Sequence, residues 1–381
     1  MSYRFTPSQQ ELREKTAAFV AREIPREVAQ EVDRRDEYPH ELMKKLGEQG
    51  FWKINIPKKY GGDEGNIIDM MIFSEEIAKA LPVLTFAAGN VQLYGSNILI
   101  VNGNDAQRDE YLPRLAKGEL KFCFGLTEPD SGSDAGNIRM SAVPDGNDYV
   151  LNGAKIFTSG ASVADISITH TRTASDRYGG ITSFLVDTRS PGYRATPLKK
   201  LGSKGSDTCE VYYENVRVSR DNILGGPECV NTAWPQMMRL LNGERLGLSA
   251  TTIGIMDTVV NECVVHIRKR KQRVGSSIRL QELEHKIAEM ATLLEAARQL
   301  AYNTASMMVN GVNCIKETAM CKYFCAETGK KVSLMGLEVM GADGYTMASS
   351  VQHLFRDISL LTIGGGTSQI QKNVIAKQLG L

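Results

Sequence analysis

The sequence predicts a multi-domain α+β fold in which two helical regions flank a region of short strands. Apolar residues recur at helical spacing up to residue 118, and the same spacing returns in residues 229–381. Between them, short apolar runs are separated by Gly, Pro and Ser. A chain of 381 residues is long enough for two or three domains. We therefore expect an N-terminal helical domain (1–118), a middle β domain (119–228) and a C-terminal helical domain (229–381).

The N-terminal region opens with a clear helix start. Thr6 suits the N-cap, Pro7 the first turn, and Gln9 the capping-box position. Helical patterns then extend to about residue 50 and again cover residues 67–117.

Strand candidates in the middle region are short and rich in β-branched and aromatic residues. They are 122–126, 166–169, 181–186 and 209–218. Within the run 148–157, Asn152-Gly153 favours a type I′ turn and predicts a hairpin. These features predict antiparallel pairing.

The C-terminal region carries long stretches with apolar residues at helical spacing. They are 234–267, 280–309 and 316–340. A last helix is predicted after Thr367.

Composition excludes several classes of protein. With 45 Lys+Arg and 44 Asp+Glu, the net charge of +1 gives no general attraction to nucleic acid or membranes. No apolar run reaches the ~18–20 residues of a membrane span, and the N-terminus lacks a signal-peptide pattern, so we expect a cytoplasmic protein. The 7 scattered cysteines argue against a disulfide framework, and the 5 histidines form no metal-ligand cluster.

Motifs in register along the whole chain resemble the acyl-CoA dehydrogenases. They are LTEPDSGSD (126–134), LGSKGSDT (201–208), Arg270-Lys271-Gln272 with Gln281, and GTSQIQ (366–371). The resemblance implies an N-terminal helical domain, a central antiparallel β-barrel and a C-terminal four-helix bundle, assembled as a homotetramer. It also implies FAD, held between the β domain and the bundle with a contact from a neighbouring subunit.

The resemblance further implies which residues contact FAD. Phe124, Leu126 and Thr127 would border the isoalloxazine ring, with Thr127 donating hydrogen bonds to its N1/O2 edge. Phe157 and Ser159, two apart on a predicted strand, would stack on the ring and hydrogen-bond near N5. An ordinary core aromatic is the alternative for Phe157. The remaining implied contacts are Ser133, Arg270, Gln281, Glu338, Gly341, Gly365, Thr367 and Gln369.

The basic run 268–273 has three interpretations: a solvated helix end, a nucleic-acid patch, or a diphosphate contact. The resemblance assigns Arg270 to a diphosphate of the neighbouring subunit, for which a guanidinium is well shaped. Two departures lie on this side of the cofactor. Arg273-Val274 replaces the usual Phe-Gly, and residues 338–342 read EVMGA where many members have Gln-x-x-Gly-Gly.

Dehydrogenation needs a base for the α proton while a hydride moves to flavin N5. Many members carry this Glu in a C-terminal loop, where this chain has Gly365. A second group carries it on a bundle helix before an Arg, and Glu244-Arg245 matches that arrangement. We therefore predict Glu244 as the base, supported by Arg245; the alternative is a solvent-facing glutamate paired with a neighbouring cation. Ser133 and Asn242 would contact the pantetheine arm of coenzyme A.

The predicted activity is FAD-dependent α,β-dehydrogenation of an acyl-CoA, as in fatty acid β-oxidation, with an electron-transferring flavoprotein as the implied electron partner. Gly364 and Gly365 replace larger side chains beside the flavin, which favours a branched, cyclic or polar acyl chain. We expect that chain to be short or medium in length. Residues 319–326 also resemble the crotonobetainyl-CoA reductase-like branch, so reduction of an enoyl-CoA is an alternative. A desulfinase-like relative and a non-catalytic acyl-CoA-binding protein are further alternatives; an intact Glu244 argues against the desulfinase.

Overall fold

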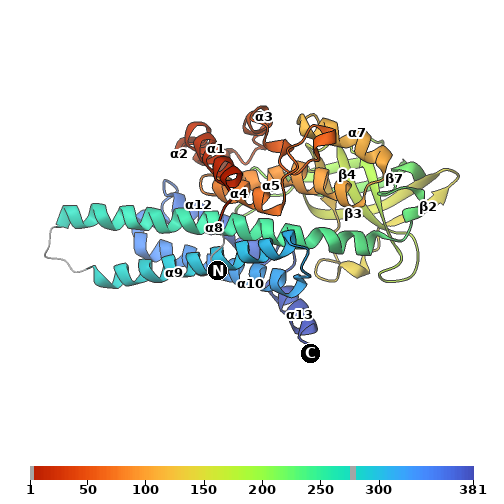
Figure 1. The fold of residues 1–381 in the computed structure, drawn as a ribbon. Coiled ribbons are helices and arrows are strands. Elements are labelled where there is room, and N and C mark those ends of the chain that lie inside the picture. Colours follow the sequence, from red (N-terminus) through yellow and green to blue (C-terminus); the bar gives the residue numbers. More distant parts are fainter. Residues whose placement is uncertain (1–3, 275–279) are drawn as a thin grey trace.

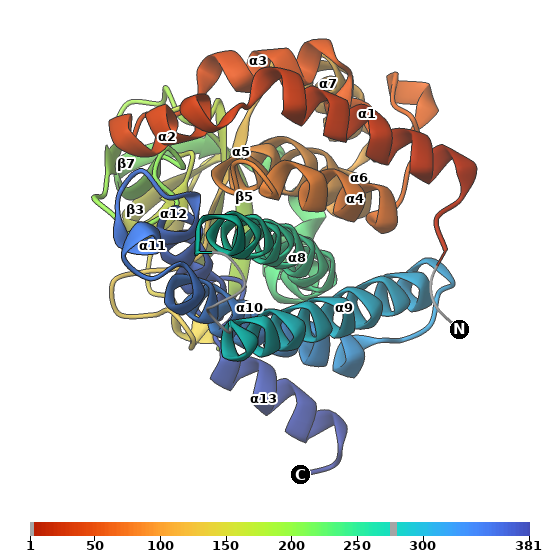
Figure 2. The same cartoon turned by 90° about the vertical axis from the view of Figure 1, so that its left-hand side faces the viewer.

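The structure is a computed structural model that describes residues 4–274 and 280–381. Figure 1 shows the sheet at one end of the molecule and the long C-terminal helices extending toward the other. The N-terminal helices lie along one side of both parts, and the same arrangement is visible in Figure 2.

The N-terminal domain is helical, and its first helix begins where the sequence predicts. Thr6 accepts a hydrogen bond from the Gln9 backbone N–H, and the Gln9 side chain accepts one from the Thr6 backbone N–H, which is a complete capping box. The elements are α1 (Pro7–Glu23), α2 (Arg26–Arg35), α3 (His40–Glu48), α4 (Ile67–Ala78), α5 (Val83–Val91), a π-helical turn η3 (Gln92–Asn97), α6 (Ile98–Asn102) and α7 (Asp105–Ala116).

The middle domain is a single sheet, which contains seven strands in the described residues. They are β1 (Phe122–Gly125), β2 (Ser141–Asp145), β3 (Asp148–Ser159), β4 (Ile166–Arg172), β5 (Ile181–Asp187), β6 (Tyr193–Pro197) and β7 (Thr208–Ser219). The order is β1-β4-β2-β3-β7-β6, and β5 pairs with β4. The pairs β2–β3, β3–β7, β4–β5 and β6–β7 are antiparallel as expected, whereas β1 runs parallel to β4.

The prediction of a hairpin turn at Asn152-Gly153 is wrong. Strand β3 runs through both residues, and the turn between β2 and β3 is made at Gly146, with φ of 64°. The ladder between β3 and β7 shifts register between Leu151 and Gly153, which marks a bulge. Gly153 has φ of 145°, and a Cβ there would approach Met140 to 2.8 Å. The glycine therefore serves the bulge, a requirement that local sequence does not distinguish from a turn.

The C-terminal domain is helical and agrees closely with the predicted stretches. Its long helices are α8 (Ala233–Val274), α9 (Gln281–Val309) and α10 (Ile315–Met340), and α13 (Ser368–Gln378) follows its N-cap Thr367. Two shorter helices were not anticipated, α11 (Ala342–Tyr345) and α12 (Ser350–Ile358). Among the described residues one helix, α8, is long and apolar enough to cross a membrane by composition alone, but 61% of that window is buried inside the protein.

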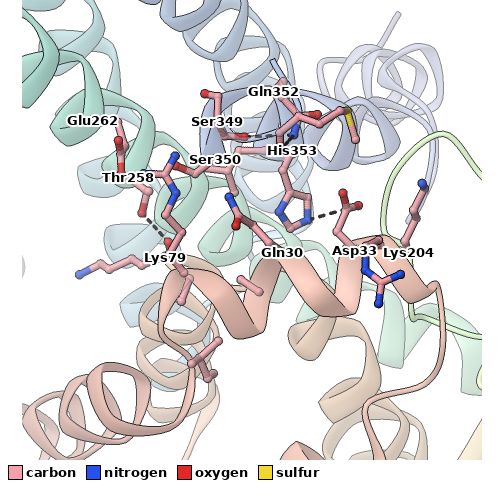
Figure 3. Close-up of a pocket in the computed structure, with 17 residues that line it drawn as sticks. Gln30, Asp33, Lys79, Lys204, Thr258, Glu262, Ser349, Ser350, Gln352 and His353 are labelled. Atoms are coloured by element: carbon pink, nitrogen blue, oxygen red, sulfur yellow. Dashed lines mark hydrogen bonds and ion pairs between the residues drawn. The ribbon is translucent and has the colours of Figure 1, made fainter. Parts of the chain in front are cut away.

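One buried cluster joins all three domains. We call it the three-domain cluster: Asp33 of α2, Ser203 of the loop before β7, and His353, Arg356 and Asp357 of α12. Arg356 binds Asp33 (2.6 Å), and the Ser203 backbone N–H donates to Asp357 (2.6 Å). His353 Nε2 lies 3.2 Å from Asp357 Oδ2 and 3.9 Å from Asp33 Oδ1. Figure 3 shows Asp33 and His353 beside a cavity of about 490 Å³ between α2 and α12.

Candidate functional site

The predicted base and the glycine that replaces the usual loop acid lie next to each other. Glu244 is on α8, and Gly365 is in the loop between α12 and α13. A Cβ built on Gly365 would lie 3.9 Å from Glu244 Oε1. A side chain at position 365 would therefore lie close to the Glu244 carboxylate. A carboxylate carried by either position could act on the same part of a bound substrate.

The surroundings of Glu244 suit acid–base chemistry. Its carboxylate is partly buried, and its Oε1 accepts a hydrogen bond of 2.9 Å from the Tyr94 hydroxyl. Loss of water raises the pKa of Glu244, while Tyr94 and the positive charges of Arg245 and Lys322 oppose that rise. A carboxyl with a raised pKa can both accept and return a proton near neutral pH.

Lys322 is a buried cation that sequence reasoning left without a role. Its Nζ donates a 2.6 Å hydrogen bond to the carbonyl oxygen of Gly366. Burial lowers the pKa of Lys322 to about 8, and the charge of Glu244 opposes this. Lys322 follows the fully buried Cys321 on α10. A lysine within a buried helical stretch is the signal from which a role for Lys322 could have been predicted.

Arg245 and Asn242 lie together, one turn apart on α8. Arg245 Nη1 donates to Asn242 Oδ1 at 3.2 Å, and only 7% of Arg245 is exposed. Its Nε has no hydrogen-bond partner within the described part of the chain. Burial lowers the pKa of Arg245, with the Glu244 charge opposing. An unsatisfied buried N–H beside Glu244 fits a site that receives a polar ligand atom.

The loop after β1 is fixed to β3 by a buried ion pair. Lys155 Nζ contacts Glu128 (2.7 Å) and the carbonyl oxygen of Leu126 (3.2 Å), and the Ile156 N–H donates to the Thr127 carbonyl (2.8 Å). Burial lowers the pKa of Lys155 to about 8, with Glu128 opposing. The predicted flavin-edge residues Leu126 and Thr127 thus have a rigid support that the sequence did not reveal.

Phe157 is not a core aromatic. It is 64% exposed and has φ of 57°, a conformation that non-glycine residues rarely adopt. It lies in a second register shift of β3, between Lys155 and Thr158. Thr158 is buried, and Ser159 is half-buried with its hydroxyl 3.3 Å from that of Thr208. An exposed ring on a strained bulge, with hydroxyl groups nearby, fits the stacking and polar contacts that a flavin ring needs.

The other residues predicted near the flavin ring differ in their contacts and in their exposure to solvent. Phe124 stacks on Tyr94, with centroids 4.9 Å apart, which brings β1 close to the Glu244 carboxylate. Thr367 caps α13, and Gln369 and Ser133 are exposed. Sequence reasoning gave no role to Gln371, which donates to the carbonyls of Gly365 (3.1 Å) and Gly366 (3.0 Å).

Four of the residues predicted to contact FAD lie in another part of the structure. They are Arg270, Gln281, Glu338 and Gly341, all exposed. Glu338 pairs with Lys286 at 2.9 Å, and Arg270 lies roughly 39 Å along α8 from Glu244. Figure 1 shows this end of α8 at the opposite end of the molecule from the sheet that carries Phe157. The side chain of Arg273 lies outside the described residues.

Comparison with known proteins covers nearly the whole chain. Family models described as "Acyl-CoA dehydrogenase, N-terminal domain", "middle domain" and "C-terminal domain" match residues 6–119, 123–216 and 231–380. A 3-(aryl)acrylate reductase of Clostridium sporogenes is 36% identical, covering 98% of this chain and 99% of the relative. The caffeyl-CoA reductase–Etf complex subunit CarC of Acetobacterium woodii is 33% identical, covering 98% and 99%. The butyryl-CoA dehydrogenase structure of Megasphaera elsdenii superposes with a TM-score of 0.94 at 27% identity, covering 100% of both chains.

Proposed function

Because this chain belongs to the acyl-CoA dehydrogenase family of FAD-dependent oxidoreductases, we propose that it interconverts an acyl-CoA and its 2-enoyl-CoA with Glu244 as the acid–base residue. One observation supports this most directly. The Glu244 carboxylate lies within 3.9 Å of the point where a Cβ at position 365 would stand, and that position is a glycine. The helix carboxylate therefore takes the place of a loop carboxylate.

Different residues of the chain are proposed to bind the flavin, transfer the α proton and bind the thioester oxygen. Phe157, Thr127 and Ser159 would hold the flavin ring, and FAD when bound supplies the two-electron chemistry at the β carbon that no side chain can perform. Glu244 takes the α proton during dehydrogenation or returns it during reduction. The backbone N–H of Gly365 would donate to the thioester oxygen as that atom gains negative charge.

The proposed substrate is a short or medium acyl thioester with a branched or cyclic chain. Gly365 brings no side chain to the Glu244 carboxylate, and a Cβ at Gly364 would meet no atom closer than 3.7 Å, which supports room for a branched or cyclic chain. Reduction of an aryl-substituted enoyl thioester is the second candidate, favoured by relatives named as 3-(aryl)acrylate reductase and caffeyl-CoA reductase. The latter is a subunit of a complex with Etf, so an electron-transferring flavoprotein is the proposed electron partner.

A second copy of the chain is part of the proposal. Arg270 lies near the end of α8, at the opposite end of the molecule from the sheet that carries Phe157 (Figure 1), and we propose that Arg270, Gln281, Glu338 and Gly341 contact the flavin nucleotide of another copy. A homotetramer in which the bundle end of one copy meets the β domain of another would complete the cofactor site.

The test uses anaerobic flavin bleaching. Purified enzyme is mixed with isovaleryl-CoA and cyclohexanecarboxyl-CoA, and chemically reduced enzyme is mixed with cinnamoyl-CoA, while flavin absorbance is followed. We expect at least one reaction, slowed by about 10²-fold or more in Glu244→Gln. Glu262→Gln, a half-buried glutamate farther along α8, is the matched control. Full rate in Glu244→Gln would exclude the proposed base, and protein without flavin absorbance would favour a non-catalytic binding protein.

A further inference from the structure

Tyr94 reaches the Glu244 carboxylate from a different domain. We infer that Tyr94 is a positioning residue of the acid–base group: its hydroxyl holds Oε1 of Glu244 and leaves Oε2 to exchange the α proton of the thioester. This rests on the proposed role of Glu244. The hydrogen bond is 2.9 Å long, and it is the one recorded on this carboxylate in the described part of the chain. Both side chains keep some exposed surface, so a ligand can reach them.

The Tyr94 ring packs against a wall of two aromatic side chains, Phe124 and His170. It stacks on Phe124 of β1 with centroids 4.9 Å apart and planes at 17°, and Phe124 meets the His170 ring edge-on at 4.5 Å. Burial and the charge of Lys155 lower the pKa of His170 to about 3, so this wall adds no cation to compete for Glu244. Stacking on Phe124, which itself packs against His170, thus restricts rotation of the phenol ring.

The backbone that carries Tyr94 is itself specialised. Tyr94 lies in the π-helical turn η3, and such turns occur frequently at functional sites. Buried polar groups hold the turn: Gln92 Nε2 donates to the Phe51 carbonyl at 2.9 Å, and Ser96 Oγ donates to the Gln92 carbonyl at 2.9 Å. A Cβ at Gly95 would approach Leu115 to 2.8 Å, so the turn packs closely against α7. One extra residue in a helical turn rotates the rest of the helix by about 100°, which is enough to redirect a side chain.

The charges around Glu244 explain why a neutral donor has a distinct role. Arg245 of the same helix and Lys322 of α10 act on Glu244 as positive charges, and the loop at Gly365 brings no titratable group. Among residues 4–274 and 280–381, Tyr94 of η3 is the other titratable group that acts on Glu244. Burial and the Glu244 charge raise the pKa of Tyr94 well above its ordinary value, so its hydroxyl stays protonated and donates to the ionised Glu244 carboxylate. Donation to one oxygen favours the carboxylate form and orients it.

The test is a pH titration of the Glu244 carboxyl, followed by difference infrared spectroscopy of its protonated C=O stretch, with Glu244→Gln as the blank. Tyr94→Phe should raise the titration midpoint by about one pH unit, because a hydrogen bond to the charged form is lost. Tyr111→Phe is the control: Tyr111 also belongs to the N-terminal domain and packs on β1 through Phe122, at 5.6 Å. Its midpoint should equal that of the wild type.

Turnover gives a second readout. With a substrate found in the bleaching assay, the pH limb for α-proton removal should shift upward by the same amount in Tyr94→Phe, with kcat changing more than KM. Incorporation of 3-fluorotyrosine at position 94 keeps the ring and strengthens the donor, so the midpoint should move downward. An unchanged midpoint in both variants overturns the inference. The infrared result stands apart from the proposed function, which fails separately if Glu244→Gln keeps full rate.

Discussion

The side-chain nitrogen of Lys322 lies 2.6 Å from the carbonyl oxygen of Gly366. A buried cation on α10 thereby holds the loop that replaces the usual acid-bearing segment. The same cation acts on Glu244 through its charge. Lys322 therefore connects the shape of the loop to the protonation of the proposed base.

Lys322→Met should remove a specific part of the pH dependence of stability. The folded-state pKa of Lys322 is about 8, below its ordinary value of 10.5. Between these values the unfolded chain binds more protons, so stability rises with pH, and below pH 8 the burial penalty is fully present. The wild type should gain on the order of 2–3 kcal/mol relative to the variant between pH 8 and 10.5. Urea unfolding at several pH values measures this; parallel curves would contradict it.

Gly365→Ala should destabilise the loop, whereas Gly364→Ala should not. Gly365 has φ of 65°, and a Cβ there would approach Leu248 to 2.4 Å. The expected cost is about 1–3 kcal/mol, with a loss of activity because Glu244 lies alongside. At Gly364 the nearest atom would be 3.7 Å away, which is ordinary contact. Thermal unfolding of both variants gives the comparison, and equal melting temperatures would refute it.

Breaking the Glu128–Lys155 pair should be costly, because both side chains are buried. Glu128→Gln or Lys155→Met should each lose roughly 3–5 kcal/mol, and the double variant should lose less than their sum. The Asp145–Arg217 pair on the surface of the same sheet is the control, with an expected coupling below about 1 kcal/mol. A double-mutant cycle by denaturant unfolding distinguishes the two pairs. Additive losses at Glu128 and Lys155 would mean that they are not coupled.

Phe157→Gly should weaken flavin binding without weakening the fold. The ring is 64% exposed and its φ of 57° suits glycine, so the cofactor-free protein should be as stable or more stable by about 1 kcal/mol. Loss of a stacked ring should raise the FAD dissociation constant by about 10-fold. Val143→Ala, a 59% exposed position on β2, is the control. Flavin fluorescence titration measures both, and an unchanged constant would remove Phe157 from the cofactor site.

Local sequence predicts those features that neighbouring residues determine. The Thr6–Gln9 capping box and the long helices depend on contacts a few residues apart, and both are found. Strand β6 escaped prediction because it is only five residues long, is mostly exposed and ends in a proline. The Tyr94–Glu244 contact joins residues 150 positions apart and depends on a π-helical turn. No sequence window contains both partners, so only the folded chain reveals the pair.

The three-domain cluster has a thermodynamic consequence. Asp33, Ser203 and Arg356 come from three separate parts of the chain, and each is buried or bound to a buried partner. Separating any one domain would break the Asp33–Arg356 ion pair, the hydrogen bond from the Ser203 N–H to the buried Asp357, or both. Heating should therefore give one calorimetric peak for the whole chain, and no domain should melt ahead of the others.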